Sequence, residues 1–188
     1  MDHRIIEPAS RRTSPIKSAR AEKWRDLREW IALLEREGEL VRVGVEVDPR
    51  LEVTEIVDRT VDAAGPALLF EHPKGSELPL LINQFGTERR MCLAFGVESL
   101  DEIADRLSEI LELQPPEGLA AKVRGLKTLK SIADARPRTV KRGACHEVVL
   151  KGNDVDLGRL PVQTCWPGDG GPFITLPAVI TRDPRTGQ

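Results

Sequence analysis

A dense run of turn-forming residues near the end of the sequence is the segment best suited to contact a ligand through its backbone. It reads Trp-Pro-Gly-Asp-Gly-Gly-Pro over residues 166–172. Glycine accepts a positive φ without steric cost, so such a loop lets backbone amides approach a phosphate or a ring closely. A wide turn between two strands is the simpler alternative. The run matches neither a Walker loop, since no Gly-Lys-Ser/Thr follows, nor a Rossmann fingerprint, since no helix begins after it.

Two side chains beside this loop are candidates for ligand contact. Thr175 interrupts the apolar run Phe173–Leu176, and a buried hydroxyl there needs a hydrogen-bond partner. A backbone carbonyl is the favoured partner and a ligand is the alternative. Trp166 could wall a ligand cavity, although a position in the hydrophobic core is the favoured interpretation.

Asp154 and Asp156 form an Asp-x-Asp pair just before the loop. In a strand the two carboxylates would share a face and could hold a metal ion. We expect them instead at a turn and at a strand start, where they accept backbone amides. Glu147 and Asp169 are single carboxylates without a visible partner.

The remaining reactive residues favour structural interpretations. Cys145 precedes His146, but neighbouring residues of a strand point to opposite faces, so we expect no thiolate pair. Arg89-Arg90 could clamp an anion, although a solvated helix start is favoured, and His72 is expected in an exposed turn. There is no zinc spacing and no Ser-His-Asp set. We expect three reduced, buried or half-buried thiols in a cytoplasmic protein, namely Cys92, Cys145 and Cys165.

The composition excludes several classes of protein. The 188 residues are 40% hydrophobic and 31% charged, with a net charge of −2. This balance offers no strong field for nucleic acid or an anionic membrane, and aromatic residues at 4% do not favour a base-stacking surface. No apolar run is long enough to span a membrane. Residues 1–20 are basic but lack the apolar core of a signal peptide, so we interpret them as a disordered leader, with a transit peptide as the weaker option.

Helical and strand periodicities alternate along the next part of the chain. Asp26 and Glu29 form a capping box before a helix that Gly38 ends, and valines alternate over residues 41–47 as in a strand with one wet face. The other expected elements are helices near 53–64, 87–94 and 99–114, strands at 67–70 and 78–82, and an amphipathic stretch at 119–132.

The character of the sequence changes within Ala135–Gly143. We therefore predict an α/β (α+β) domain over residues 21–135 and the start of a β-rich domain over residues 136–188. His146–Leu150 and Phe173–Arg182 are the strands expected in the second part. Two or three strands cannot close a sheet of their own, so the pattern predicts a truncated chain.

The order of residues 160–175, Leu-Pro-x-x-Thr-Cys-Trp-Pro-x-Asp-Gly-Gly-Pro-Phe-Ile-Thr, resembles the UbiD family of decarboxylases. Two earlier stretches strengthen the resemblance. One is Asp26–Leu40, and the other combines Ile82-Asn83 with Met-Cys-Leu-Ala-Phe-Gly at residues 91–96. The resemblance covers nearly all residues from Trp24 to Gln188.

The resemblance implies an N-terminal α/β domain followed by a split β-barrel of the flavin-reductase type that binds prenylated FMN. It implies a carboxy-lyase that decarboxylates an aromatic or α,β-unsaturated acid non-oxidatively, with 4-hydroxy-3-polyprenylbenzoate or a related quinone precursor as the favoured substrate. The flavin would act as the electron sink. A divalent metal, Mn²⁺ in first place, with K⁺ as an optional second ion, a flavin prenyltransferase as cofactor supplier and a homo-oligomer at full length are also implied.

By the same resemblance, Thr175 and, more loosely, Asp169, Gly170, Gly171 and Pro172 are the candidate cofactor contacts. The family's Asn, His and Glu metal ligands and its Glu-Arg-Glu proton network match no residue of this sequence. No catalytic or metal-binding residue is therefore assigned, and we expect this piece alone to be inactive. The alternatives are a flavin-dependent oxidoreductase on a similar barrel and a non-catalytic α/β interaction domain.

Overall fold

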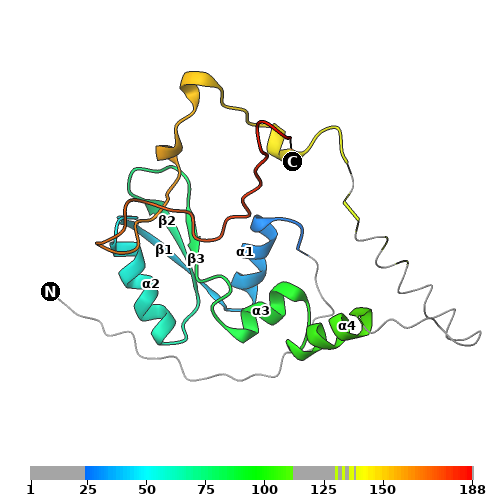
Figure 1. The fold of residues 1–188 in the computed structure, drawn as a ribbon. Helices are drawn as coiled ribbons and strands as arrows, with labels where there is room; N and C mark the ends of the chain where they lie inside the picture. Colours follow the sequence, from blue (N-terminus) through cyan, green and yellow to red (C-terminus); the bar gives the residue numbers. More distant parts are fainter. Residues whose placement is uncertain (1–23, 112–129, 131–132, 134–135, 138, 188) are drawn as a thin grey trace, which may run out of the picture.

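The computed structural model describes residues 24–111, 130, 133, 136–137 and 139–187 (Figure 1). The predicted leader, and nearly all of the amphipathic stretch predicted at 119–132, lie outside these residues. Among the described residues, no helix is long and apolar enough to cross a membrane.

A three-stranded mixed sheet forms the centre of the fold. Its strands are β1 (Leu40–Val47), β2 (Ala67–Pro73) and β3 (Leu80–Ile82), in the order β1-β2-β3. β1 and β2 are parallel and are joined through helix α2 (Glu52–Asp62), whereas β2 and β3 are antiparallel. A parallel pair needs such a crossover, because the chain must return to the same end of the sheet.

Helices cover both faces of this sheet. Helix α1 (Leu27–Arg36) packs Trp30, Leu33 and Leu34 against Ala67, and Leu93 and Ala94 of helix α3 (Glu88–Phe95) join this cluster. On the other face, Val53 of α2 packs with Val47, Leu68 and Phe70. Because the first four residues of β2 are buried, Ala67–Phe70 is a continuous apolar run rather than an alternating one.

The helix starts agree with the capping signals of the sequence. The Asp26 carboxylate accepts from the amides of Arg28 and Glu29 at 3.0 Å, and Thr87 caps α3. The reciprocal contact of the predicted box is shifted by one residue, since Glu29 accepts from the amide of Arg25. Glu102 accepts from the amides of Glu98 and Ser99 at the start of α4 (Asp101–Leu111).

The strand bounds differ from the prediction. β2 continues through His72 to Pro73, so the exposed His72 lies on a strand and not in the predicted turn. β3 begins at Leu80, two residues later than expected. The alternation in β1 is interrupted by a register shift between Val43 and Glu46, and Val45 remains exposed.

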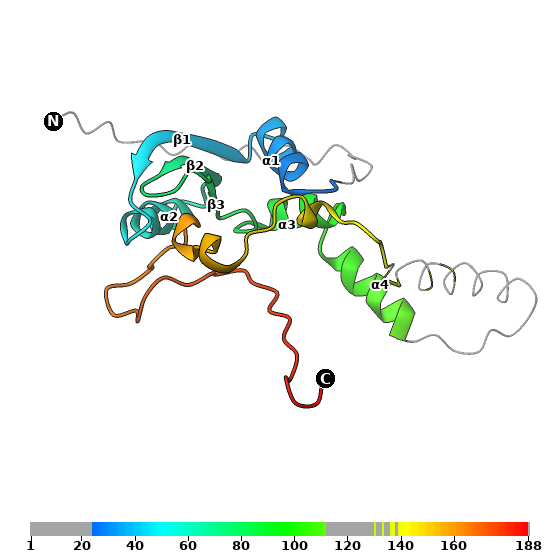
Figure 2. The same cartoon turned by 90° about the horizontal axis from the view of Figure 1, so that it is seen from above.

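The strands predicted at His146–Leu150 and Phe173–Arg182 are not formed. In residues 139–187 the structure has three short 3-10 turns, at Ala144–His146, Gly152–Asp154 and Leu157–Arg159, and one isolated bridge between Arg50 and Thr164. Figures 1 and 2 show this part as an extended path beside the sheet. A strand exists only when its amides pair with a neighbour, and no described segment is aligned to provide that pairing.

A buried arginine of helix α3 joins two loops of the domain. Arg90 of α3 is 1% exposed and donates through Nη1 to Glu39 Oε2 and to the Gly65 carbonyl, both at 3.1 Å. Burial lowers the pKa of the Arg90 guanidinium, and Glu39 opposes that shift. The neighbouring Arg89 pairs with Glu37 and Glu39. The solvated helix start predicted for Arg89-Arg90 is therefore wrong for Arg90, whose charge is compensated inside the fold.

The loop before α3 also contacts the α2–β2 loop, through Asn83. Asn83 has a φ of 59° and donates through Nδ2 to the Pro66 carbonyl at 2.9 Å. A Cβ on Gly86 would lie 1.7 Å from Asn83 Oδ1, so only glycine fits at that position. Ile82-Asn83, one of the stretches behind the family resemblance, thus holds the α2–β2 loop in place.

An aspartate organises the turn between β1 and α2. Asp48 accepts from the amide of Arg50 at 2.8 Å and from Lys74 Nζ at 3.2 Å. The hydrogen bond from the Arg50 amide, and then the Lys74 ammonium, lower the pKa of the Asp48 carboxyl. The turn is therefore stabilised by the ionised form of Asp48.

We expect Arg90→Ala to lower the free energy of unfolding by about 3 kcal/mol, because it leaves part of a buried ion pair without its partner. Arg106→Ala is the matched control. Arg106 is 64% exposed in an i,i+4 pair with Glu102, and its loss should cost less than about 1 kcal/mol. Urea unfolding followed by tryptophan fluorescence measures both, and equal effects would contradict the role given to Arg90.

We expect the stabilisation by Asp48 to depend on pH. Its folded-state pKa lies below the unfolded value of about 4, so its contribution is present above about pH 4 and is lost as the pH falls through the folded pKa. The difference in unfolding free energy between the wild type and Asp48→Ala should therefore shrink from pH 7 to pH 3. Asp58→Ala removes a carboxylate at an exposed position of α2 and is the matched control variant. A difference for Asp48→Ala that is constant with pH would argue against this interpretation.

Candidate functional site

The turn-rich loop at Trp166–Pro172 is closed by its own aspartate. Asp169 Oδ2 accepts from the Trp166 amide at 2.8 Å, and the Asp169 amide donates to the Trp166 carbonyl at 3.1 Å. The Phe173 amide donates to the Gln163 carbonyl at 3.1 Å and brings the two ends of the loop together. Asp169, which has no visible partner in the sequence, thus has a defined structural role.

The backbone of this loop is not covered by other groups at its glycines. Gly171 has a φ of 153°, which side chains rarely allow, and a Cβ built on Gly168, Gly170 or Gly171 would meet no atom within 4 Å. No described group of the protein fills that space. The glycines therefore leave a stretch of main chain accessible to a ligand or to another segment.

The two side chains predicted to be buried near the loop are exposed. Trp166 is 58% exposed, so the favoured core position is wrong. Thr175 is also exposed, and no hydrogen bond of its hydroxyl is seen within the described part of the chain, so the expectation of a buried hydroxyl bonded to a carbonyl is wrong as well. Both errors have one cause, since the apolar run around Thr175 has no sheet to pack against.

Hydrogen bonds at two places attach residues 159–164, just before the loop, to the turns that follow β1 and β2. The Leu51 amide donates to the Thr164 carbonyl at 2.9 Å, and the Thr164 amide donates to the Pro49 carbonyl at 3.3 Å. Ser76 Oγ donates to the Arg159 carbonyl at 2.7 Å. Residues 49–51 follow β1 and Ser76 follows β2, so both anchors lie at the carboxyl edge of the parallel pair. Leu51 has a φ of 72°, a strained conformation for leucine.

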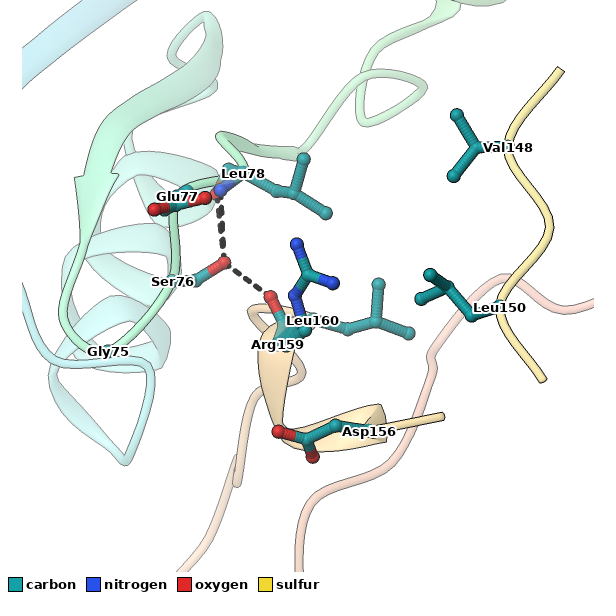
Figure 3. A pocket seen from close by; sticks show the side chains of 9 residues that line it. All are labelled: Gly75, Ser76, Glu77, Leu78, Val148, Leu150, Asp156, Arg159 and Leu160. Carbon is teal, nitrogen blue, oxygen red and sulfur yellow. Dashed lines mark hydrogen bonds between the residues drawn. The ribbon is translucent and has the colours of Figure 1, made fainter. Parts of the chain in front are cut away.

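A cavity of about 530 Å³ lies between the β2–β3 turn and residues 148–160 (Figure 3). Leu78, Val148, Leu150 and Leu160 supply its apolar wall. Its polar groups come from Glu77, Asp156, Arg159 and Ser76, and Figure 3 shows the hydrogen bond of Ser76 at its edge. None of the predicted cofactor contacts lines this cavity. The sequence analysis did not single out Ser76, because one serine in a Gly-Ser turn carries no distinctive signal.

The other candidate residues for metal binding or catalysis lie in turns. Asp156 accepts from the Gly158 amide at 2.8 Å, as expected, but it caps a 3-10 turn and not the start of a strand. Asp154 lies in a 3-10 turn. The described residues contain no group of three His, Cys, Asp or Glu side chains that could hold a metal ion. Cys145 and His146 lie in an exposed 3-10 turn and not on the strand that we assumed in setting aside a thiolate pair.

The three cysteines differ in burial. Cys92 is buried, and burial raises the pKa of its thiol, with the Glu88 and Glu102 charges adding to the shift. Cys165 is half-buried and Cys145 is exposed. All three are free, as expected, but the prediction of burial holds only for Cys92 and Cys165.

Two family models match the chain in sequence order. The 3-octaprenyl-4-hydroxybenzoate carboxy-lyase N-terminal domain matches residues 31–107, which include most of α1, the whole sheet and α3. The Rift-related domain of the same carboxy-lyase matches residues 138–188, which include the turn-rich loop.

Solved structures of UbiD-class enzymes are similar to this chain. HmfF from Pelotomaculum thermopropionicum, in an evolved dimeric form with prFMN, matches with a TM-score of 0.62 and 29% identity over 85% of this chain and 33% of its own. HmfF with FMN matches with a TM-score of 0.61 and 29% identity over 85% of this chain and 31% of its own.

The vanillic acid decarboxylase of Sedimentibacter hydroxybenzoicus, in its open form, matches with a TM-score of 0.60 and 27% identity over 80% of this chain and 30% of its own. The chain thus spans about a third of the length of the enzymes it matches. The two family models and these enzymes agree with the three sequence stretches that carry the resemblance. The chain belongs to the UbiD family of carboxy-lyases.

Proposed function

We propose that this chain is the N-terminal part of a prenylated-FMN-dependent carboxy-lyase that removes CO₂ from an aromatic or α,β-unsaturated acid without oxidation. The observation that carries the proposal is the match of both carboxy-lyase domains in order, together with the similarity to an enzyme solved with prFMN. The proposal assigns residues 21–135 to the α/β domain and residues 136–188 to the first part of the cofactor-binding barrel.

Thr175 and the loop residues Asp169–Pro172 are the proposed contacts on the cofactor side. Three features support this role: the open backbone at Gly170 and Gly171, the closure of the loop by Asp169, and the accessible hydroxyl of Thr175. When bound, prenylated FMN supplies the electron sink for the charge left by departing CO₂. The chain's own contribution would be to present main-chain amides and one hydroxyl at a fixed place beside the sheet.

Mn²⁺ or another divalent ion, with K⁺ as a second ion, belongs to the proposal. No ligand is assigned to this chain, since its described residues lack a suitable cluster. Catalytic proton transfer is likewise assigned to none of its residues.

The proposed substrate is 4-hydroxy-3-polyprenylbenzoate or a related quinone precursor. Its support is the match to a carboxy-lyase of that substrate class, while a structural neighbour is a decarboxylase of vanillic acid, a smaller aromatic acid. A flavin prenyltransferase as supplier, assembly into a homo-oligomer and a cytoplasmic location complete the proposal.

The first test uses the source DNA and the protein it encodes. We expect the codons after Gln188 to continue with an Arg-Asn-x-Gly-x-Tyr-Arg-like sequence. The extended protein, expressed with a flavin prenyltransferase, should then bind flavin and release CO₂ from an aromatic acid. The 188-residue chain expressed in the same way should not retain stoichiometric flavin, measured by absorbance. Stoichiometric flavin on the short chain, or oxidation of NAD(P)H without CO₂ release by the extended protein, would overturn the proposal.

The second test addresses the loop. Asp169→Ala in the extended protein removes the acceptor that closes the loop, and we expect flavin affinity to fall about tenfold, the effect of losing one hydrogen bond to a charged group. Asp183→Ala is a matched control, because Asp183 closes a turn in the same segment by accepting from the amides of Arg185 and Thr186. Equal flavin occupancy in the two variants would exclude the proposed role of Asp169.

A further inference from the structure

Helix α4 carries an apolar stripe that the rest of the described chain leaves largely uncovered. Leu107 is 55% exposed, Ile110 is 42% exposed and Leu111 is 84% exposed, whereas Ile103, one turn before Leu107, is half-buried. These four residues follow the spacing i, i+4, i+7, i+8, which places them on one side of a helix. Figures 1 and 2 both show α4 apart from the sheet. Such a helix gains most of its stability from another apolar surface that covers its stripe.

The polar side of α4 is acidic. Residues 101–111 contain four acidic residues and one basic residue. The basic residue, Arg106, pairs with Glu102 at 3.5 Å. Asp101 and Asp105 lie one turn apart, are exposed and form no ion pair within the part of the chain that the structure describes. The charge that α4 leaves uncompensated is therefore negative, and a segment with basic residues beside an apolar stripe would match it.

The sequence that follows α4 contains a segment of that kind at residues 119–132. Its apolar residues Leu119, Val123 and Leu126 repeat at i, i+4 and i+7, the spacing of an amphipathic helix. It has no acidic residue, and its charged residues are Lys122, Arg124, Lys127 and Lys130. Lys130, which the structure describes, is helical, as is Ala133 just after the segment.

The spacing of the apolar residues is the same on both sides of the connection. Residues 112–118 form this connection, and their length is in the usual range for two packed helices. The two prolines at its centre cannot continue a helix, and a short connection makes neighbouring helices antiparallel. In an antiparallel pair that turns at these prolines, Leu107 is opposite Val123. In the same register Leu111 is opposite Leu119.

The charges agree with this register. The turn that sets Leu107 opposite Val123 brings Asp101 beside Lys130. It also brings Lys127 within one helical turn of Asp105. Opposite charges on packed helices favour one partner and one orientation, whereas two acidic faces repel each other. A basic segment therefore suits the stripe of α4 better than a second copy of α4 does.

We propose that the apolar stripe of α4 is the docking surface for residues 119–132 of the same chain, which pack against it antiparallel as a basic amphipathic helix. The contact covers Leu107, Ile110 and Leu111 and sets the two free aspartates of α4 against lysines. It makes a helical hairpin beside the α/β domain. This inference is independent of the proposed carboxy-lyase function.

A disulfide tests the register. Leu107→Cys combined with Val123→Cys, in a chain with Cys145 and Cys165 changed to Ser, places two thiols on the facing sides of the hairpin. Arg106→Cys combined with Val123→Cys is the control, because residue 106 lies about 100° around the helix from residue 107. Two unpacked segments would crosslink equally in both chains. We expect the Leu107 pair to form an intrachain disulfide at least tenfold faster under mild oxidation, measured by non-reducing gel electrophoresis and peptide mass spectrometry.

A charge reversal tests the electrostatic part. Lys127→Glu sets a carboxylate near Asp105 and should lower the hydrogen-exchange protection of the α4 amides about threefold, the effect of one surface ion pair. Adding Asp105→Lys to the same chain should restore the protection. Lys151→Glu makes the same charge change at an exposed residue outside the hairpin and should leave α4 unaffected. Equal crosslinking rates of the two cysteine pairs, disulfides formed only between chains, or equal protection of α4 in the two glutamate variants would overturn the proposal.

Discussion

The buried ion pair between Arg90 and Glu39 is the constraint on which the arrangement of the α/β domain depends. One guanidinium group on α3 reaches the residue that precedes β1 and the Gly65 carbonyl that precedes β2. A charge that is 1% exposed cannot be left unpaired without a large penalty, so these three segments must meet in one way. The tight fit of Gly86 against Asn83 shows how little variation the site allows.

The α/β domain holds residues 139–187 through hydrogen bonds to its turns. The turns after β1 and β2 lie at the same edge, where they hold Thr164 and Arg159 through backbone and hydroxyl contacts. The turn-rich loop starts two residues after Thr164 and is closed by Asp169. The position of the proposed cofactor contacts is therefore set by the carboxyl edge of the sheet, although none of them belongs to it.

Comparison of sequence and structure shows which signals are reliable. Local signals were sufficient where one residue bonds to a near neighbour: the Asp26 cap is formed, and Asp156 accepts a backbone amide. The burial of Arg90 was missed, because its partners Glu39 and Gly65 are distant in sequence and any Arg-Arg pair at a helix start has the same local pattern. The strands expected at His146–Leu150 and Phe173–Arg182 had the right composition, but strand formation needs a partner.

The sequence alone determined the family, the approximate places of the helices and the mixed α/β character, because these depend on residue type, periodicity and short-range hydrogen bonds. Only the tertiary structure decided which charges are buried, which edge of the sheet remains open, and that Trp166 and Thr175 are exposed. The physical reason is that burial and strand pairing are properties of two segments brought together. A pattern within one segment can require such a partner, but it does not reveal where the partner lies.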